Sequence, residues 1–264
     1  MKKILIICLG VILLAPASLH AQKLYGGIGL GYGLRLAPNF VGADQTSSSL
    51  TSVSKSFGAG FSAGIMAGYF LNEGNLALQL DVNYLMGSKI EITQITPFVD
   101  DNYTYKSRMI RVAPSFKFTF GEKIKPYARF GVVFGFGAKL IEDYKWKDFF
   151  AGVDVNEITE YTSGLSVGFT SATGINFNLS DKISFFAEIA AIAQNWAPKN
   201  SIITKYVYGG VDVLSTMTTN QKETEYVDSY DPNTVIGSGS PDKELKFYMP
   251  FSSWGINLGV NIWF

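Results

Sequence analysis

Eight segments of this chain alternate between apolar side chains and small or polar ones, with a period of two residues. The first, 24–36, places Ile28, Leu30 and Tyr32 on one face and mostly glycine on the other. The remaining segments are 57–71, 76–86, 110–120, 129–140, 165–179, 183–194 and 253–264. Successive side chains of a β-strand point to opposite faces, so each segment is predicted to be a strand with one apolar face.

The connections between these segments alternate between short and long. The short ones are 72–75, 121–125 and 180–182. The long ones are about 37–56, 88–103, 142–161 and 195–244. Bacterial outer-membrane barrels sort their turns in this way, short on the periplasmic side and long outside the cell, whereas a soluble β-sandwich does not. We therefore predict an all-β fold: an eight-stranded antiparallel up-and-down transmembrane β-barrel with both termini in the periplasm.

Both ends of the chain fit export to an outer membrane. Residues 1–21 combine a basic start, an apolar run and the small residue Ala21, which is the organisation of a secretory signal peptide. We therefore expect a signal peptide at 1–21 and a single barrel domain at 22–264. The last strand ends on an aromatic residue. We expect the barrel-assembly machinery to recognise three of its apolar residues as an assembly signal: Val260, Ile262 and Phe264.

The residue types of the chain exclude several kinds of chemistry. The single Cys and single His are Cys8 and His20, both inside the predicted signal peptide, so the exported part has no disulfide, imidazole base or Cys/His metal site. Acidic and basic residues balance at 22 each, which gives no reason to expect nucleic-acid binding. Two stretches, 60–64 and 164–168, read Gly-x-Ser-x-Gly, but a nucleophile elbow needs a strand-to-helix turn and a base. We predict no enzyme activity and no cofactor.

The small and polar face of the predicted strands carries five charged residues: Asp81, Arg111, Lys117, Arg129 and Glu188. A buried charge without a partner is strongly destabilising, so acids and bases should pair. We expect Asp81 and Glu188 to be the acidic partners. Arg129, with Lys117 or Arg111, should supply the basic partners and close the interior as a salt-bridge plug. An ion pathway and a proton relay are the alternatives, and Lys139 is expected on the same face, higher up.

The long connections are the parts that a barrel does not account for. Outward Lys106 and Arg108 cannot lie in hydrocarbon, so the hairpin that contains them should rise above the bilayer. The strand edge that ends in Tyr103 and Tyr105 is a candidate site for strand addition. The fourth long connection offers four aromatic groups suited to protein contacts: Tyr206, Tyr208, Tyr226 and Tyr230.

The export signal, the eight amphipathic segments and the terminal Phe264 resemble the small outer-membrane barrels of the OmpX and OmpA transmembrane type. The glycine-rich opening 24–33 and the Ala21-Gln22 junction resemble the outer membrane protein beta-barrel domain family of Bacteroidetes, which includes PorT-like members. The resemblance covers the whole exported chain but rests on pattern rather than motif, so it transfers no functional residues. It implies a place in the outer membrane of a Gram-negative cell. Outer-membrane lipid, lipopolysaccharide and the barrel-assembly machinery are then the expected partners.

The residues of the predicted strands are accounted for by a lipid-facing surface and a packed interior. We therefore expect the function to lie in the long extracellular loops or in the barrel as a whole. The leading expectation is a non-enzymatic barrel whose extracellular loops bind a partner or whose shell adds to envelope integrity. The main alternative is a component of an envelope secretion or assembly system, as in PorT-like relatives, with an extracellular or secretion-system protein as partner. A lipid-modifying barrel enzyme and a narrow, porin-like pore for small solutes are the remaining alternatives.

Overall fold

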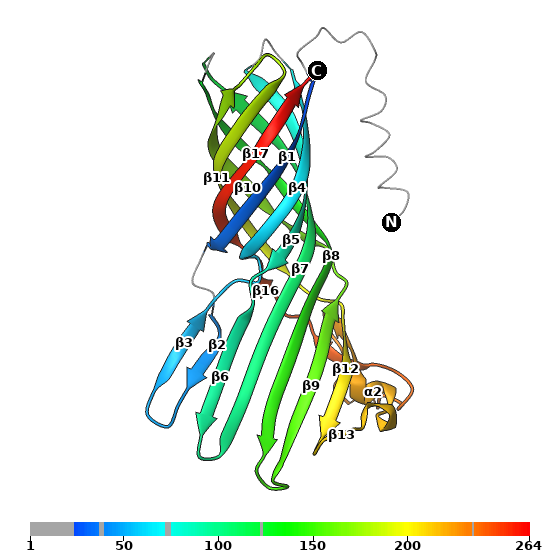
Figure 1. The fold of residues 1–264 in the computed structure, drawn as a ribbon. Helices are drawn as coiled ribbons and strands as arrows, with labels where there is room; N and C mark the ends of the chain where they lie inside the picture. Colours follow the sequence, from blue (N-terminus) through cyan, green and yellow to red (C-terminus); the bar gives the residue numbers. More distant parts are fainter. Residues whose placement is uncertain (1–23, 37–39, 72–74, 122–123, 234) are drawn as a thin grey trace.

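The computed structural model describes residues 24–36, 40–71, 75–121, 124–233 and 235–264 (Figure 1). Strands make up most of this part of the chain, and its helices are the single turn η1 (Leu214–Thr216) and the short α2 (Thr219–Lys222). The all-β prediction is confirmed. No helix in these ranges is long and apolar enough to cross a membrane. The predicted signal peptide, 1–21, lies outside the described residues.

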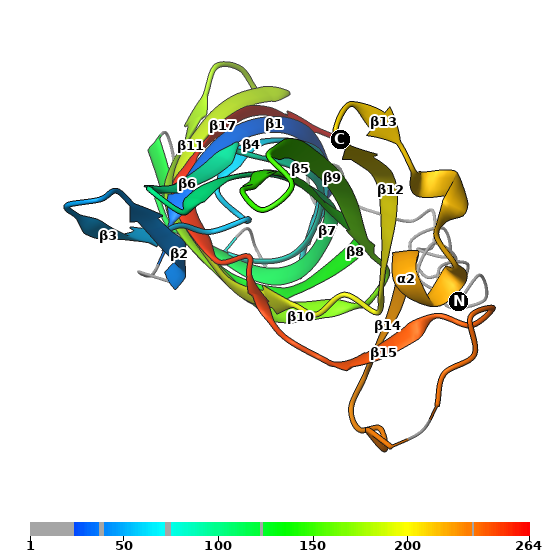
Figure 2. The same ribbon diagram turned by 90° about the horizontal axis from the view of Figure 1, so that it is seen from below.

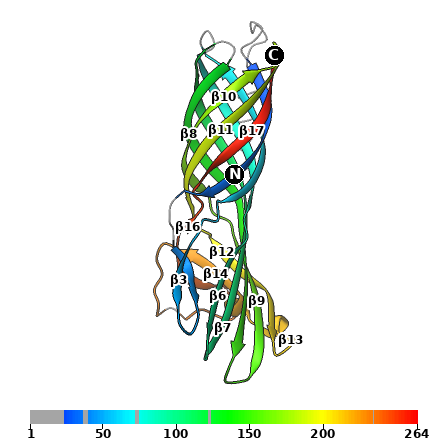
Figure 3. The ribbon, with the colours of Figure 1, turned by 60° about the vertical axis from the view of Figure 1, so that its left-hand side comes forward.

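A ring of antiparallel pairings joins eight strands. These strands form a closed cylinder (Figures 2 and 3). In order around the cylinder they are β1 (Leu24–Arg35), β4 (Gly60–Phe70), β5 (Leu76–Gly87), β7 (Val99–Thr119), β8 (Ile124–Asp148), β10 (Ser166–Asn178), β11 (Ile183–Trp196) and β17 (Ser253–Trp263). Each strand pairs antiparallel with the next in this order, and β17 also pairs with β1. The ladders therefore return to their starting strand and leave no free edge in the wall.

The described chain has seventeen strands where eight were expected, because the long connections fold into strands of their own. The added strands are β2 (Phe40–Gln45), β3 (Leu50–Ser54), β6 (Ile90–Thr96), β9 (Val153–Thr162), β12 (Asn200–Tyr208), β13 (Val211–Asp212), β14 (Glu223–Val227), β15 (Asp242–Leu245) and β16 (Met249–Pro250). β7 at 99–108 and β8 at 139–148 continue past the cylinder and pair with β6 and β9, and β9 pairs with β12. We call these extensions, with β6, β9 and β12, the raised sheet (Figure 1).

The raised sheet lies at one end of the cylinder, here called the sheet end. The opposite end, where β1 begins and β17 ends, is here called the turn end (Figure 1). Two smaller groups of strands border the raised sheet (Figure 2). On one side the β2–β3 hairpin meets β6 at a parallel bridge between Gln45 and Gln94, and Thr93 N–H donates to Asp44 at 2.9 Å. On the other side β12 pairs with β13 and β14, and β15 runs parallel to β14. Segments of the long connections thus border the raised sheet on both sides.

The outside of the cylinder is apolar and its inside is narrow. Leu30 and Leu258 are paired across β1 and β17, and their side chains are 57% and 56% exposed. On the inner face, a Cβ added to Gly68 would collide with the ring of Tyr25. The glycines of the inner face therefore leave space for large side chains from the opposite wall.

A bulge in β8 reverses the faces of this strand partway along its length. On one side of it Ile110 pairs with Phe136, and on the other Arg108 pairs with Lys139, so β8 has one more residue than β7 between the two pairs. Gly137 within the bulge has φ +57°, a left-handed conformation that favours glycine. Lys139 was predicted to face the interior, but it lies on the outer face with Arg108, because a shift of one residue exchanges the two faces of a strand.

Candidate functional site

Three charged side chains form a buried cluster in the interior of the cylinder. Arg129 of β8 lies between Asp81 of β5 and Glu188 of β11. Its Nε and one terminal nitrogen contact the two oxygens of Glu188 at 3.0 and 2.6 Å, and its other terminal nitrogen contacts Asp81 at 3.2 Å. All three residues are more than nine-tenths buried. One guanidinium therefore bridges both of the acids that were expected in the interior.

Neutral groups supply further hydrogen bonds to the two acids. The Tyr127 hydroxyl and the Asn257 side-chain amide donate to Glu188 at 2.9 and 2.8 Å. The Gln79 amide donates to Asp81 at 2.9 Å. Buried ion pairs are tolerated when such bonds satisfy the remaining lone pairs, and a satisfied network is rigid. The cluster therefore has the contacts of a structural plug.

Lys117 or Arg111 was expected to supply a second basic partner, and Lys117 forms no ion pair among the described residues. Its Nζ lies 4.0 Å from the ring centroid of Tyr127 and 5.1 Å from that of Tyr25. In the register of β7 and β8, Lys117 stands directly opposite Arg129, whose forked guanidinium presents five donors and binds both carboxylates. The faces of the two aromatic rings are the electronegative surfaces next to the ammonium group.

Arg111 also has no acidic partner in the described part of the chain. Its Nε donates to the Gln194 side chain at 3.0 Å, and a terminal nitrogen donates to the carbonyl of Phe251 at 2.7 Å. A cavity of about 40 Å³ adjoins it and is also lined by Ser62 and Asn257, with room for a few water molecules. Ser62 comes from the first Gly-x-Ser-x-Gly stretch and lies within strand β4, not on a strand-to-helix turn.

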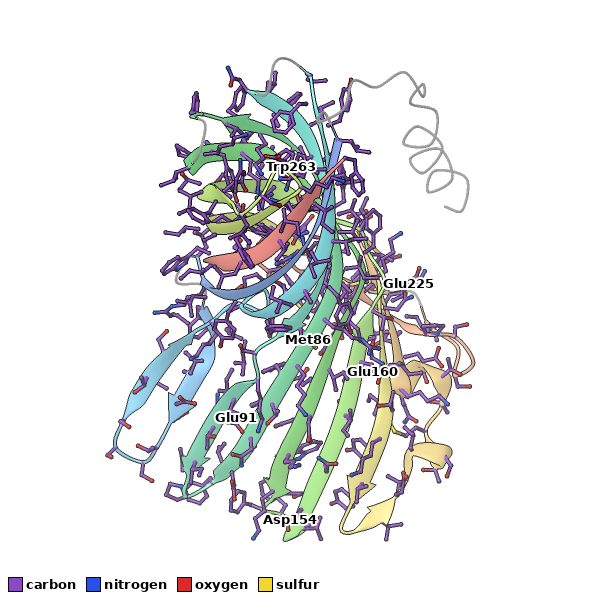
Figure 4. All side chains as sticks on the ribbon, turned by 45° about the horizontal axis from the view of Figure 1, so that its top comes forward. Met86, Glu91, Asp154, Glu160, Glu225 and Trp263 are labelled. Atoms are coloured by element: carbon purple, nitrogen blue, oxygen red, sulfur yellow. The ribbon has the colours of Figure 1, made fainter. Side chains whose placement is uncertain are left out.

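Apolar layers flank the charged cluster toward both ends of the cylinder. At the turn end three aromatic rings pack with centroids 5.1, 5.7 and 5.8 Å apart: Tyr25, Phe70 and Trp263. Trp263 is labelled in Figure 4. At the sheet end Trp196 and Phe251 are fully buried within a larger apolar cluster. The interior is thus filled by an apolar, a charged and a second apolar layer of side chains.

The predicted assembly signal lies at the turn end, on the outer face of β17. Ile262 and Phe264 are exposed, and Val260 is half-buried. The backbone N–H of Phe264 donates to the carbonyl of Leu24 at 2.9 Å, so the last residue continues the pairing of β17 with β1. The three side chains are therefore accessible from outside the wall.

The raised sheet carries stacked aromatic rings on the face that continues the inside of the cylinder. The rings of Tyr103 and Tyr144 stack with centroids 4.2 Å apart, and those of Tyr144 and Trp146 with centroids 4.4 Å apart. Tyr206 of β12 meets Trp146 edge-on at 6.2 Å. All four side chains are half-buried. We call these four residues the aromatic face; their mutual packing on a hydrogen-bonded sheet holds them in place.

Glu142 lies on the same face, nearer the cylinder, without a cation partner among the described residues. The hydroxyls of Tyr105 and Tyr161 donate to its two carboxylate oxygens at 3.0 and 2.8 Å. Burial raises the pKa of the Glu142 carboxyl above its usual range. Burial and the adjacent Glu142 carboxylate also raise the pKa of Tyr105 and of Tyr161. Glu142 is therefore a half-buried acid held by two tyrosine hydroxyls.

The tyrosines predicted to contact partners differ in whether the structure leaves them accessible. Tyr103 and Tyr105 do not form a free strand edge, because β7 pairs with β6 on one side and with β8 on the other. Tyr226 is only 6% exposed and hydrogen-bonds to another side chain, so it is not available for a partner. Tyr208 and Tyr230 are exposed. Together with Tyr206 of the aromatic face, they remain accessible.

A model of the outer membrane protein beta-barrel domain family matches residues 5–229, which is more than half of the chain. The chain belongs to this family. The resemblance seen in the sequence is thereby confirmed, and the protein is located in the outer membrane. Two solved structures are similar over 93% of this chain and 100% of their own: Neisserial surface protein A, at 15% identity and TM-score 0.38, and a major outer membrane protein from Thermus thermophilus, at 11% and 0.37. A comparison with curated proteins finds no match.

Three residues of this outer-membrane barrel protein's raised sheet were missed from the sequence because they were assigned to a loop: Glu142, Tyr144 and Trp146. A signal was present. Residues 142–147 read Glu-Asp-Tyr-Lys-Trp-Lys, with aromatic and charged residues alternating at the period of a strand. Such a stretch is typical of a strand that is aromatic on one face and solvated on the other.

Proposed function

We propose that the eight strands of the cylinder span the outer membrane, with the turn end in the periplasm and the raised sheet outside the cell. The exposed apolar outer face supports this, since large side chains such as Phe169 and Ile189 would face lipid. The filled interior also supports it, because an eight-stranded wall encloses just enough space for side chains. Residues 1–21 would then serve as the export signal.

We propose further that the protein is a non-enzymatic binding protein whose aromatic face contacts a protein outside the cell. The observation that carries the proposal is the set of half-exposed Tyr and Trp rings, held rigid by stacking on the raised sheet. Tyr and Trp are enriched at protein interfaces, where they bury a large area at a small cost in side-chain entropy. The filled interior does not favour a pore for solutes, which needs an open path along the inside of the cylinder.

Site-specific photo-crosslinking in living cells tests the binding proposal. A photoreactive residue at Tyr206, on the aromatic face, should capture an extracellular protein, whereas one at the exposed Lys145 of the outer face should not. The double variant Trp146→Ser and Tyr206→Ser should abolish the associated phenotype while the protein keeps its heat-modifiable mobility on gels. Equal capture from both faces, or an unchanged phenotype in the double variant, would show that the aromatic face is not the binding surface.

The same variants separate binding from a role of the shell alone. If only membrane integrity depends on this protein, removal of the protein should sensitise cells to detergents, and the aromatic-face variant should protect them as well as the wild type does. If binding matters, the variant should behave like the deletion in the assay of the bound partner. Tyr226→Phe is a matched control, because Tyr226 is buried in the same region.

A further inference from the structure

Two cations face each other on the outside of the molecule where the cylinder meets the raised sheet. Arg108 of β7 stands directly opposite Lys139 of β8. The neighbour of Arg108 on its other side is Met86, 45% exposed, and the next outward residue toward the turn end is Ile110, 43% exposed. Figure 4 labels Met86 and Glu160 at this junction. The cations therefore lie one row beyond the apolar outer surface.

The charges in this row are incompletely neutralised by the protein. Like charges directly opposite each other on a sheet are destabilising. Lys139 is ion-paired with Glu160 of β9. Arg108 is exposed, and so is Lys106, which lies two residues nearer the tip of the raised sheet on β7. Neither forms an ion pair among the described residues. Two cations thus remain open to an anion from outside the chain.

Three other described strands of the cylinder carry apolar residues in place of cations on the outer face at this end. On β1, β10 and β17, the outward residues toward the sheet end are Leu34, Val167 and Trp254, all exposed and apolar. The bulge at Gly137 is what brings Lys139 onto the outer face, opposite Arg108. Without the extra residue, the interior-facing and outward-facing positions beyond it would be exchanged. Local backbone geometry therefore builds the cationic group at this one place.

We propose that Arg108 and Lys106, beside the ion-paired Lys139, bind the phosphate headgroup of an anionic lipid in the outer leaflet. The proposal rests on the membrane orientation given above, which puts this row just outside the hydrocarbon, at the level of the headgroups. A guanidinium matches a phosphate with two parallel hydrogen bonds, and the lysine ammonium groups add charge beside it. The apolar surface formed by Met86 and Ile110 would contact the acyl chains of the same lipid.

Native mass spectrometry of the full protein, with mixed phosphatidylglycerol and phosphatidylcholine, tests this site. Wild-type protein should retain phosphatidylglycerol in preference to phosphatidylcholine, and the preference should weaken as salt is raised. The double variant Arg108→Gln and Lys106→Gln should lower the preference by about fivefold for each charge removed. Arg108→Lys, which keeps the charge, should retain more of the preference than Arg108→Gln does.

Lys145→Gln with Lys147→Gln is the matched control, because both residues are exposed on β8 nearer the tip of the raised sheet. This pair should leave the lipid preference unchanged, and heat-modifiable mobility should confirm folding of every variant. Equal retention of the two lipids by wild type, or the same loss in the control pair, would overturn the proposal. Displacement of the lipid by excess inorganic phosphate would assign the site to free phosphate instead. Crosslinking of a protein partner from Tyr206 should persist in the Arg108 variants. Loss of lipid preference and loss of protein binding can therefore be told apart.

Discussion

Replacing Arg129 by Met should strongly destabilise the cylinder. The substitution removes contacts of 2.6, 3.0 and 3.2 Å and leaves Asp81 and Glu188 buried without the cation that they share. Breaking one buried ion pair by removing a partner costs about 3–5 kcal/mol. Because two acids lose the same partner, we expect the free energy of unfolding to fall by an amount at the upper end of that range, about 5 kcal/mol.

Urea unfolding in lipid vesicles, followed by tryptophan fluorescence, measures this loss. Lys117→Met is the control, since it breaks no ion pair and removes contacts with the rings of Tyr25 and Tyr127, worth about 2 kcal/mol when desolvated. Adding Asp81→Asn and Glu188→Gln to Arg129→Met should recover more than half of the loss, because neutral hydrogen-bonded groups cost less to bury than charges. A loss below about 1 kcal/mol for Arg129→Met, well under the range for a broken buried pair, would refute the reasoning. Failure of the triple variant to recover would refute it too.

Planar-bilayer recordings of the intact protein should show little conductance, because side chains fill the interior; a large, steady open channel would contradict the plug. Deleting Phe264 should lower the yield of heat-modifiable barrel, whereas Phe150→Ala, at an exposed aromatic outside the cylinder, should not; equal yields would remove Phe264 from the assembly signal. The raised pKa of Glu142 favours its neutral form in the folded state, so the raised sheet should be most stable at acid pH and lose stability as pH rises through that pKa. Glu142→Gln should flatten this dependence in urea titrations at several pH values, and an unchanged profile would show that another group is responsible.

The strands of the cylinder could be predicted because a wall with an apolar outer face and packed side chains inside imposes a period of two. Leu30 and Leu258 follow that rule on adjacent strands. The interior acids could also be predicted, since period and turn positions give face and approximate height. The choice of base could not, because Lys117 and Arg129 stand at the same height and only the reach and shape of their side chains decide between them.

The raised sheet was less predictable, for a different physical reason. The alternation of 142–147 was visible, but the bulge at Gly137 shifts the pattern by one residue, so an extrapolated face assignment comes out reversed. A bulge depends on the local backbone conformation of one or two residues. Because β8 contains several glycines, the sequence does not indicate that Gly137 is the one that forms the bulge. Tyr226 shows a similar limit: its loop position suggested exposure, whereas folding of the long connection buries it.

The Gly137 bulge also determines how the raised sheet can change its length. Beyond the bulge, inserting or deleting residues in pairs on β7 and β8 would lengthen or shorten the raised sheet while each side chain kept its side. A single insertion or deletion in β8 between Gly137 and Tyr144 would exchange the two faces of the strand beyond it. Tyr144 and Trp146 would then lie on the outer surface, and Lys145 and Lys147 on the inner one. The wall below would be untouched. The raised sheet is thus free to vary in size in steps of two residues, independently of the cylinder.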